Sequence, residues 1–299
     1  MFLMIPVTDM KKTSKMSDRN ASSTALETLY MRAVHQLLDA HPLILDDPVA
    51  LTLLGEDAMQ QIKKSHKHHC KLEARALRAH VVLRSRFTED RLAEAVERGI
   101  VQYVILGAGF DTFAFRQPVW ARNLKIFEID QPATSAQKRA RLSEAGMAIL
   151  PNLRFADIDF ERESLRDGLI RNGVSMTEPT FFSWLGVTMY IQEEAINAVL
   201  RTVAEFPAQS EIVFTFTQPP DLLSGAESKF HSSLSKVVTD AGEPFVSYFT
   251  TAAIEGKLRD AGFKNIAFLS NEEAEKRYFR MRPPDIFISK RTSIAYAML

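Results

Sequence analysis

The chain has 299 residues, of which 46% are hydrophobic and 25% charged, and it balances 37 basic against 37 acidic side chains. This composition is typical of a folded globular protein, and its charge balance provides no basic excess that would bind nucleic acid or an anionic membrane surface. The lone cysteine, Cys70, excludes an internal disulfide framework, and no apolar run reaches membrane-spanning length. We therefore expect a cytoplasmic protein, and a homodimer would not be unusual.

The first hundred residues carry helical patterns. Thr24-Ala25-Leu26-Glu27 has the pattern of a capping box with Thr24 as N-cap, and apolar residues then recur at helical spacing. A second helix is predicted to start at Asp47-Pro48 and to stop at Gly55, and a third runs from about residue 57 to residue 98. Because no strand pattern intervenes, residues 1–98 are predicted to form a tail and a helical cap over or beside a separate sheet.

One helical turn in this region gathers side chains of the metal-ligand types, namely His66, His68, His69 and Cys70. Four ligands cannot converge on one ion from a single turn. We interpret the cluster as a polar helix surface and predict no metal site.

From Ile100 onward, short apolar runs alternate with helical segments, which is typical of βα units around a parallel sheet. Strands are predicted at residues 101–106, 125–129, 153–156, 180–184, 211–217, 265–269 and 285–289. Residues 99–299 are thus predicted to form one Rossmann-like α/β domain. Within it, residues 218–247 are rich in Pro, Gly and Ser around one helical piece, and we predict that they form a lid insertion.

A glycine-rich turn follows the first predicted strand. Gly107-Ala108-Gly109 would let the backbone approach a ligand closely where the chain bends. A dinucleotide fingerprint requires a third glycine where this chain has Thr112. The departure weakens a pyrophosphate site and favours a ligand without phosphates, such as S-adenosylmethionine (SAM).

Acidic residues follow the next two strands. Asp130 lies 23 residues after Gly107, close to the offset of a carboxylate that binds ribose hydroxyls, although it could instead cap the helix after Pro132. Asp159 and Phe160, after the third strand, suit an adenine amino group and ring, and an exposed acidic turn is the alternative for neighbouring Asp157.

These motifs together resemble the leucine carboxyl methyltransferase family, which includes polyketide carboxyl methyltransferases of secondary metabolism. The similar segments cover most of the chain: Asp46-Asp47-Pro48, Arg84-Ser85-Arg86-Phe87, Val104 to Thr112, Arg116, Glu128 to Pro132, and Trp184 to Tyr190. The resemblance implies the fold of class I SAM-dependent methyltransferases, a mainly parallel seven-stranded sheet with an antiparallel last strand. It also implies methyl transfer from SAM to a small acceptor.

The resemblance further implies a set of cofactor contacts. Arg84 would pair with the methionine carboxylate of SAM, with Arg86 as second choice, because arginine suits bidentate, charge-assisted pairing. The remaining implied contacts are Gly107, Ala108 and Gly109 to the methionyl portion, Asp130 to the ribose with Gln131 beside it, and Asp159 with Phe160 to the adenine.

Two residues after the fourth strand bear on the reaction. Tyr190 is predicted as a catalytic residue, since side chains at this place face the transferable methyl group in the fold class, and core packing is the alternative. Leu185 departs from the family, because many relatives carry a glutamate there.

Several reactions follow from these residues. A carboxylate acceptor is already ionised, whereas a hydroxyl acceptor would require a base, and no histidine is positioned by pattern to serve as one. This favours O-methylation of a carboxylate and leaves a hydroxyl open. Leu185 motivates an alternative, the cyclisation of SAM to methylthioadenosine and an azetidine-2-carboxylate type of amino acid. An NAD-dependent dehydrogenase is favoured by Gly107, Gly109 and Asp130 and opposed by Thr112, and a non-catalytic binding protein is a further alternative.

Overall fold

A seven-stranded sheet with the order β3-β2-β1-β4-β5-β7-β6 organises the computed structural model, which describes residues 22–159 and 163–299. Strand β7 is antiparallel to both of its neighbours, β5 and β6, whereas the first five strands pair in parallel. The strands are β1 Gln102–Leu106, β2 Lys125–Asp130, β3 Leu153–Asp157, β4 Thr180–Trp184, β5 Glu211–Thr217, β6 Asn265–Phe268 and β7 Thr292–Met298. The predicted fold class, a Rossmann-like sheet with an antiparallel last strand, is confirmed.

The predicted strand at residues 285–289 is wrong, because the last strand is β7. The Thr292–Met298 segment pairs along its whole length with β5, and its C-terminal half also pairs with β6. Residues 285–289 instead follow Pro283-Pro284 as a loop, with Ile286 buried in the core. A short apolar run fits a buried loop as well as a strand, so its composition could not separate the two.

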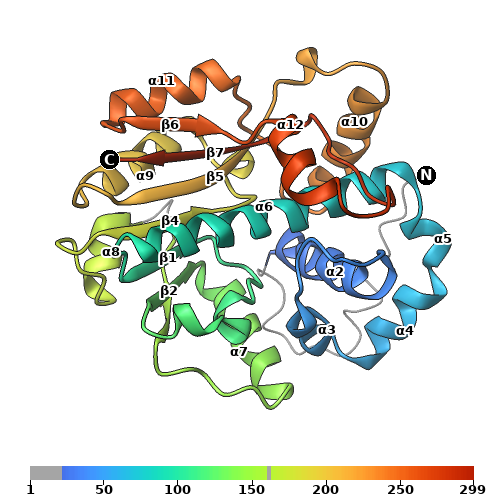
Figure 1. Cartoon of the computed structure of the whole chain (residues 1–299), viewed down its shortest axis with the longest axis horizontal. Coiled ribbons are helices and arrows are strands. Elements are labelled where there is room, and N and C mark those ends of the chain that lie inside the picture. Colours follow the sequence, from blue (N-terminus) through green and yellow to red (C-terminus); the bar gives the residue numbers. More distant parts are fainter. Residues whose placement is uncertain (1–21, 160–162) are drawn as a thin grey trace.

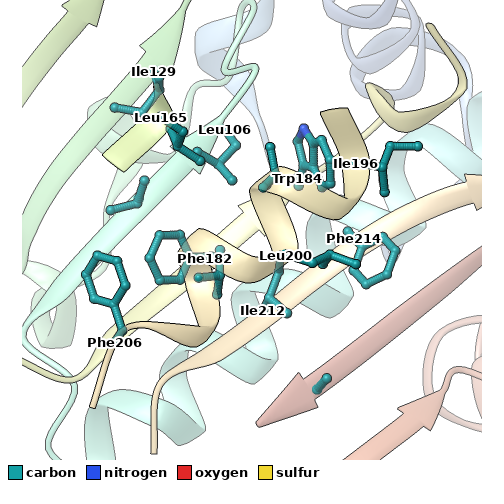
Figure 2. Close-up of a cluster of buried hydrophobic side chains, with 14 of the residues drawn as sticks. Leu106, Ile129, Leu165, Phe182, Trp184, Ile196, Leu200, Phe206, Ile212 and Phe214 are labelled. Atoms are coloured by element: carbon teal, nitrogen blue, oxygen red, sulfur yellow. The ribbon is translucent and has the colours of Figure 1, made fainter. Parts of the chain in front are cut away.

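Helices cover both faces of the sheet, as the continuous burial of its central strands requires. On one face, helices α8 Leu165–Arg171, α9 Glu193–Ala204 and α11 Thr251–Ala261 pack on Phe182, Trp184 and Phe214. Figure 2 shows this cluster, with Ile196 and Leu200 beside the aromatic side chains. The other elements after β1 are the helices α7 Pro132–Glu144, α10 Gly225–Asp240 and α12 Asn271–Ala274, a π-helical turn Glu275–Phe279, and the 3₁₀ turns Phe113–Arg116, Val119–Ala121, Thr188–Tyr190 and Pro220–Leu222.

The helices before β1 are α2 Ser23–Leu38, α3 Pro48–Leu54, α4 Glu56–Lys64, α5 His66–His69 and α6 Leu72–Glu97. Of these, α2 to α5 gather to one side of the sheet, and the long helix α6 runs from them across the sheet (Figure 1). The predicted start of α3 is confirmed, since the Asp47 carboxylate accepts from the Ala50 N–H at 3.1 Å and Pro48 is the first helical residue.

Two predictions about these helices are wrong. Ser22, not Thr24, is the N-cap of α2, and its hydroxyl accepts from the Ala25 N–H at 3.0 Å. The single helix predicted from residue 57 to residue 98 is broken into α4, α5 and α6. The short helix α5 turns His69 into the interior, where its ring lies 5.6 Å from that of Tyr30. This tertiary contact overrides the local helical pattern.

Helix α6 joins the N-terminal helices to the sheet. It packs against α2, while its Phe87, Leu92 and Ala95 share a buried cluster with Tyr103 of β1 and Phe181 of β4. A boundary near residue 98 stays a prediction, because the segments on its two sides share this core. Within the described ranges, no helix combines the length and apolarity needed to cross a membrane.

Candidate functional site

A cavity of 680 Å³ lies at the C-terminal ends of β1, β2 and β4, where ligands bind in sheets of this type. Helices α2 and α6 line it from one side, and α10 with the following residues 241–246 lines it from another. The cavity brings together the predicted site residues Arg84, Gly107, Ala108, Gly109, Asp130, Gln131, Asp159 and Tyr190. Phe160 lies outside the described residues. Arg86 points away from the cavity and forms an exposed ion pair with Asp90 at 2.8 Å.

The turn after β1 depends on its two glycines. Gly107 and Gly109 have φ angles of +63° and +52°, which other residues rarely adopt. A Cβ atom on Gly107 would overlap the Val187 side chain, and one on Gly109 would lie 3.0 Å from the Ala25 Cβ atom of α2. The glycines thus let this turn approach both the loop after β4 and helix α2.

Thr112, which replaces a third glycine, ties this turn to the N-terminal helices. It is fully buried, and its hydroxyl donates to the Asp47 carboxylate at 2.7 Å. Arg32 of α2 and Arg116 contact the same carboxylate at 3.3 and 3.4 Å. Thr112, which argues against a pyrophosphate site, therefore has a structural role, because its hydroxyl binds the Asp47 carboxylate.

Asp130 is held in the cavity by backbone donors. Its carboxylate accepts from the Gly109 N–H at 2.5 Å and from the Gln131 N–H at 2.7 Å. Helix α7 has Gln131 as its N-cap residue and no side-chain cap, so Asp130 does not cap this helix. Burial raises the pKa of Asp130, while the two backbone N–H groups oppose the rise. The carboxylate keeps lone pairs for ligand hydroxyls.

Two further acidic residues of β2 and β3, Glu128 and Asp157, do not line the cavity. Glu128 is buried in an ion pair with Lys138, and Asp157 pairs with Arg139 at 3.1 Å on the surface.

Arg84 is a buried cation that forms no ion pair with any described residue, and the Asp111 carboxylate of the same cavity acts on it electrostatically. Only 9% of its surface is exposed, and no hydrogen bond or ion pair of its guanidinium is formed with any described residue. It lies against the loop after β4, where a Cβ atom on Gly186 would be 2.6 Å from its Nη1 atom. Burial lowers the pKa of Arg84 to about 10, so the group remains charged at neutral pH. Because an unpaired buried charge is costly, this site fits an anionic ligand group.

Tyr190 and Leu185 line the cavity after β4. The Tyr190 ring centroid lies 5.4 Å from that of Phe245. Burial raises the pKa of Tyr190 to about 12, which keeps it protonated at neutral pH. Leu185 also packs against the core beneath the sheet. The position of the family's glutamate is therefore apolar here.

The charged residues of the cavity that were missed from the sequence include Glu27, Arg32, Glu243 and Arg291. Glu27 belongs to the misread capping box, and burial raises its pKa to about 7. Glu243 accepts from the Ser23 and Thr24 N–H groups at 3.0 and 3.2 Å, which links the segment after α10 to the start of α2. No local pattern marks Arg291, because its place depends on the antiparallel strand that follows it.

Comparisons with known proteins agree on one family. A model of the family described as leucine carboxyl methyltransferase matches residues 25–204. The chain is similar to YktD of Bacillus subtilis (strain 168), which is named as an S-adenosyl-L-methionine-dependent methyltransferase. The two are 30% identical over 292 residues, covering 91% of this chain and 95% of YktD.

Two solved structures share the fold. A DUF574 family protein from Streptomyces avermitilis has a TM-score of 0.57 at 16% identity, covering 94% of this chain and 99% of that one. A protein from Thermobifida fusca, described as a methyltransferase, has a TM-score of 0.54 at 18% identity, covering 83% and 91%. At these identities the two structures bear on the fold alone.

Proposed function

The chain belongs to the leucine carboxyl methyltransferase family, and from this premise we propose that it methylates a carboxylate of a small-molecule acceptor. It is a SAM-dependent transferase. The acceptor class is the part that we infer, and the comparisons offer no support for the dehydrogenase or cyclase alternatives.

The residues of the cavity fit SAM, and the unpaired Arg84 is the observation that carries this assignment. Its guanidinium would bind the methionine carboxylate, for which it has no competing partner among the described residues. The turn Gly107 to Gly109 would adjoin the methionyl portion, Asp130 and Gln131 the ribose, and Asp159 the adenine. Phe160 is proposed beside the adenine on the family resemblance alone.

SAM supplies a methyl group bonded to a positively charged sulfur. An oxygen of the acceptor carboxylate forms the new C–O bond while the methyl–sulfur bond breaks, and the electron pair of that bond stays on sulfur. No proton is transferred, so the protein's main task is to hold the reactants in line and away from water. We propose that Tyr190 helps to position them.

The histidine and the tyrosine that line the cavity are both poorly suited to act as bases, which supports an acceptor that is already ionised. Burial and the neighbouring arginines hold the pKa of His80 well below its usual range, and Tyr190 stays protonated. Neither is suited to deprotonate a hydroxyl at neutral pH. Glu27, with its pKa near 7, favours a second candidate, a hydroxyl acceptor with Glu27 as base.

A single labelling experiment separates these reactions. The purified protein is incubated with methyl-tritiated SAM and a small-molecule extract, and the products are treated with mild base. A methyl ester releases volatile tritiated methanol, whereas a methyl ether retains the label. We expect S-adenosylhomocysteine (SAH) and base-released methanol. Retained label would favour the hydroxyl acceptor, methylthioadenosine would indicate cyclisation, and Arg84→Met serves as the inactive control.

A further inference from the structure

A second unpaired arginine faces the same cavity. Arg291 directly precedes β7, is only 5% exposed, and lines the cavity beside Thr292. Its Nε and Nη1 atoms are buried without hydrogen-bond partners, and no described residue forms an ion pair with it. Because an unpaired buried charge costs stability, packing alone does not explain an arginine at this position.

Aromatic rings hold this guanidinium in place. Its carbon lies 5.6 Å from the ring centroid of Phe230 in α10 and 6.0 Å from that of Phe245. These contacts use the π faces of the rings and leave the guanidinium N–H groups for in-plane hydrogen bonds.

The charged and titratable groups around Arg291 do not neutralise it. Tyr190, Glu227 and Tyr248 act on it electrostatically, and Arg291 in turn acts on His80 and on Arg84. Glu227 is the carboxylate among these groups, and it accepts from the Ser289 hydroxyl at 2.8 Å and the Lys290 N–H at 3.1 Å. It forms no ion pair with Arg291.

SAM does not supply an ion-pair partner for Arg291. SAM carries one carboxylate, which Arg84 receives in the proposed function, and its sulfur adds positive charge to the cavity. Arg291 is left without a counter-ion from either the described residues or SAM. The acceptor is the remaining molecule in the reaction that can provide one.

We propose that Arg291 is a specificity-determining residue that binds the acceptor carboxylate, and that the acceptor is a compact acid with an apolar body. The proposal rests on the proposed function. Pairing of one carboxylate oxygen with Arg291 would hold the acceptor and leave the other oxygen free to take the methyl group. The apolar body would pack on Leu234 and Val238 of α10 and on Phe245. Methylation removes the negative charge of the carboxylate, so the ester product binds Arg291 more weakly and dissociates.

The test uses SAH-loaded protein and acids of known structure. Isothermal titration measures the binding of hexanoate, phenylacetate and 4-phenylbutyrate, each against its neutral amide, to the wild type and to Arg291→Met, Arg291→Lys and Arg280→Gln. Arg280 is an exposed arginine outside the cavity and serves as the matched control. We expect the wild type and Arg280→Gln to prefer at least one acid over its amide by tenfold or more. The preference should vanish in Arg291→Met and survive in part in Arg291→Lys.

Two further readouts distinguish specificity from structure. SAH affinity should be the same in all four proteins, and the melting temperature of Arg291→Met should equal or exceed that of the wild type, because an unpaired buried charge has been removed. An unchanged acid preference in Arg291→Met would overturn the proposal. So would the absence of any acid preference in the wild type, or a fall in both melting temperature and SAH affinity. Failure of the wild type to bind SAH would instead contradict the proposed function.

Discussion

At the scale of single residues, the site is a collection of charged groups that folding alone does not explain. Arg84 and Arg291 are buried without counter-ions among the described residues, and Glu27 has a carboxyl group with a pKa near 7. Each costs stability in the free protein, since a buried charge without a partner is disfavoured. Such costs concentrate where ligands bind, because the ligand supplies the missing partner.

The role of Arg84 predicts opposite effects on binding and on stability. Arg84→Met should weaken SAM binding at least tenfold, about 1.4 kcal/mol or more, by removing a charge-assisted pair. The free energy of unfolding of the ligand-free protein should be unchanged or higher. Calorimetric titration and urea unfolding measure the two effects.

Arg86→Met is the control, since Arg86 is exposed and, among the described residues, forms an ion pair only with Asp90. It should change stability by no more than about 0.5 kcal/mol and leave SAM binding intact. Equal loss of binding in both variants would contradict the assignment of Arg84.

Glu27 predicts a pH dependence of SAM binding. Burial raises its pKa from 4.5 to about 7, so the unfolded chain loses this proton at lower pH than the folded protein does. The group therefore lowers stability progressively as pH rises from 4.5 to 7. Because SAM bears positive charge, it should favour the ionised carboxylate, and its affinity should rise between pH 5.5 and 7.5. Titrations of the wild type and Glu27→Gln across this window check the effect. A rise of equal size in Glu27→Gln would assign the dependence to another group.

At the scale of elements, the cavity depends on loops that approach one another more closely than side chains would allow. Gly107 packs on Val187, and Gly186 packs on the Arg84 guanidinium, so the loops after β1 and β4 and helix α6 meet at one place. Thr112 fastens the loop after β1 to the Asp47 carboxylate at the start of α3, and Glu243 fastens the segment after α10 to the first N–H groups of α2.

Gly186→Ala should disturb Arg84 through this contact. Gly186 has a φ angle of +75°, and an added Cβ atom would lie 2.6 Å from Nη1 and 3.0 Å from Cζ of Arg84. The guanidinium must move, so SAM binding should weaken about as much as in Arg84→Met. The double variant should bind no more weakly than either single variant, because both changes remove one interaction.

Gly256→Ala is the matched control. Gly256 lies within helix α11, and an added Cβ atom would meet nothing within 4 Å. This change should raise the free energy of unfolding by about 0.5–1 kcal/mol and leave SAM binding unchanged. Additive losses in Gly186→Ala/Arg84→Met would contradict a shared mechanism.

At the scale of the whole molecule, one cavity and one long helix connect the N-terminal helices to the sheet. The cavity takes its lining from α2 and α6 as well as from the strand ends and α10. Helix α6 contributes to the core beneath the sheet and also contacts α2. Ligand binding should therefore stabilise both parts together.

Calorimetric melting tests this coupling. SAH at a hundred times its dissociation constant should raise the free energy of unfolding by about 2.7 kcal/mol and shift a single transition of the whole chain upward. At the same SAH concentration, Arg84→Met should show a smaller shift. Two transitions, only one of which moves with SAH, would indicate that the N-terminal helices unfold separately, as a domain boundary near residue 98 predicts.

The sequence by itself determined the features that depend on residues close to one another along the chain. Alternating βα patterns predicted the sheet, Gly107 and Gly109 marked the turn after its first strand, and Asp130 stood at the end of the second. Only the tertiary structure decided which distant side chains share the cavity. Thr112 reaches Asp47, Glu243 reaches the start of α2, and Arg291 enters the cavity because β7 runs antiparallel beside β5. These contacts follow from long-range pairing and burial, which leave no periodic or spacing signal in the chain.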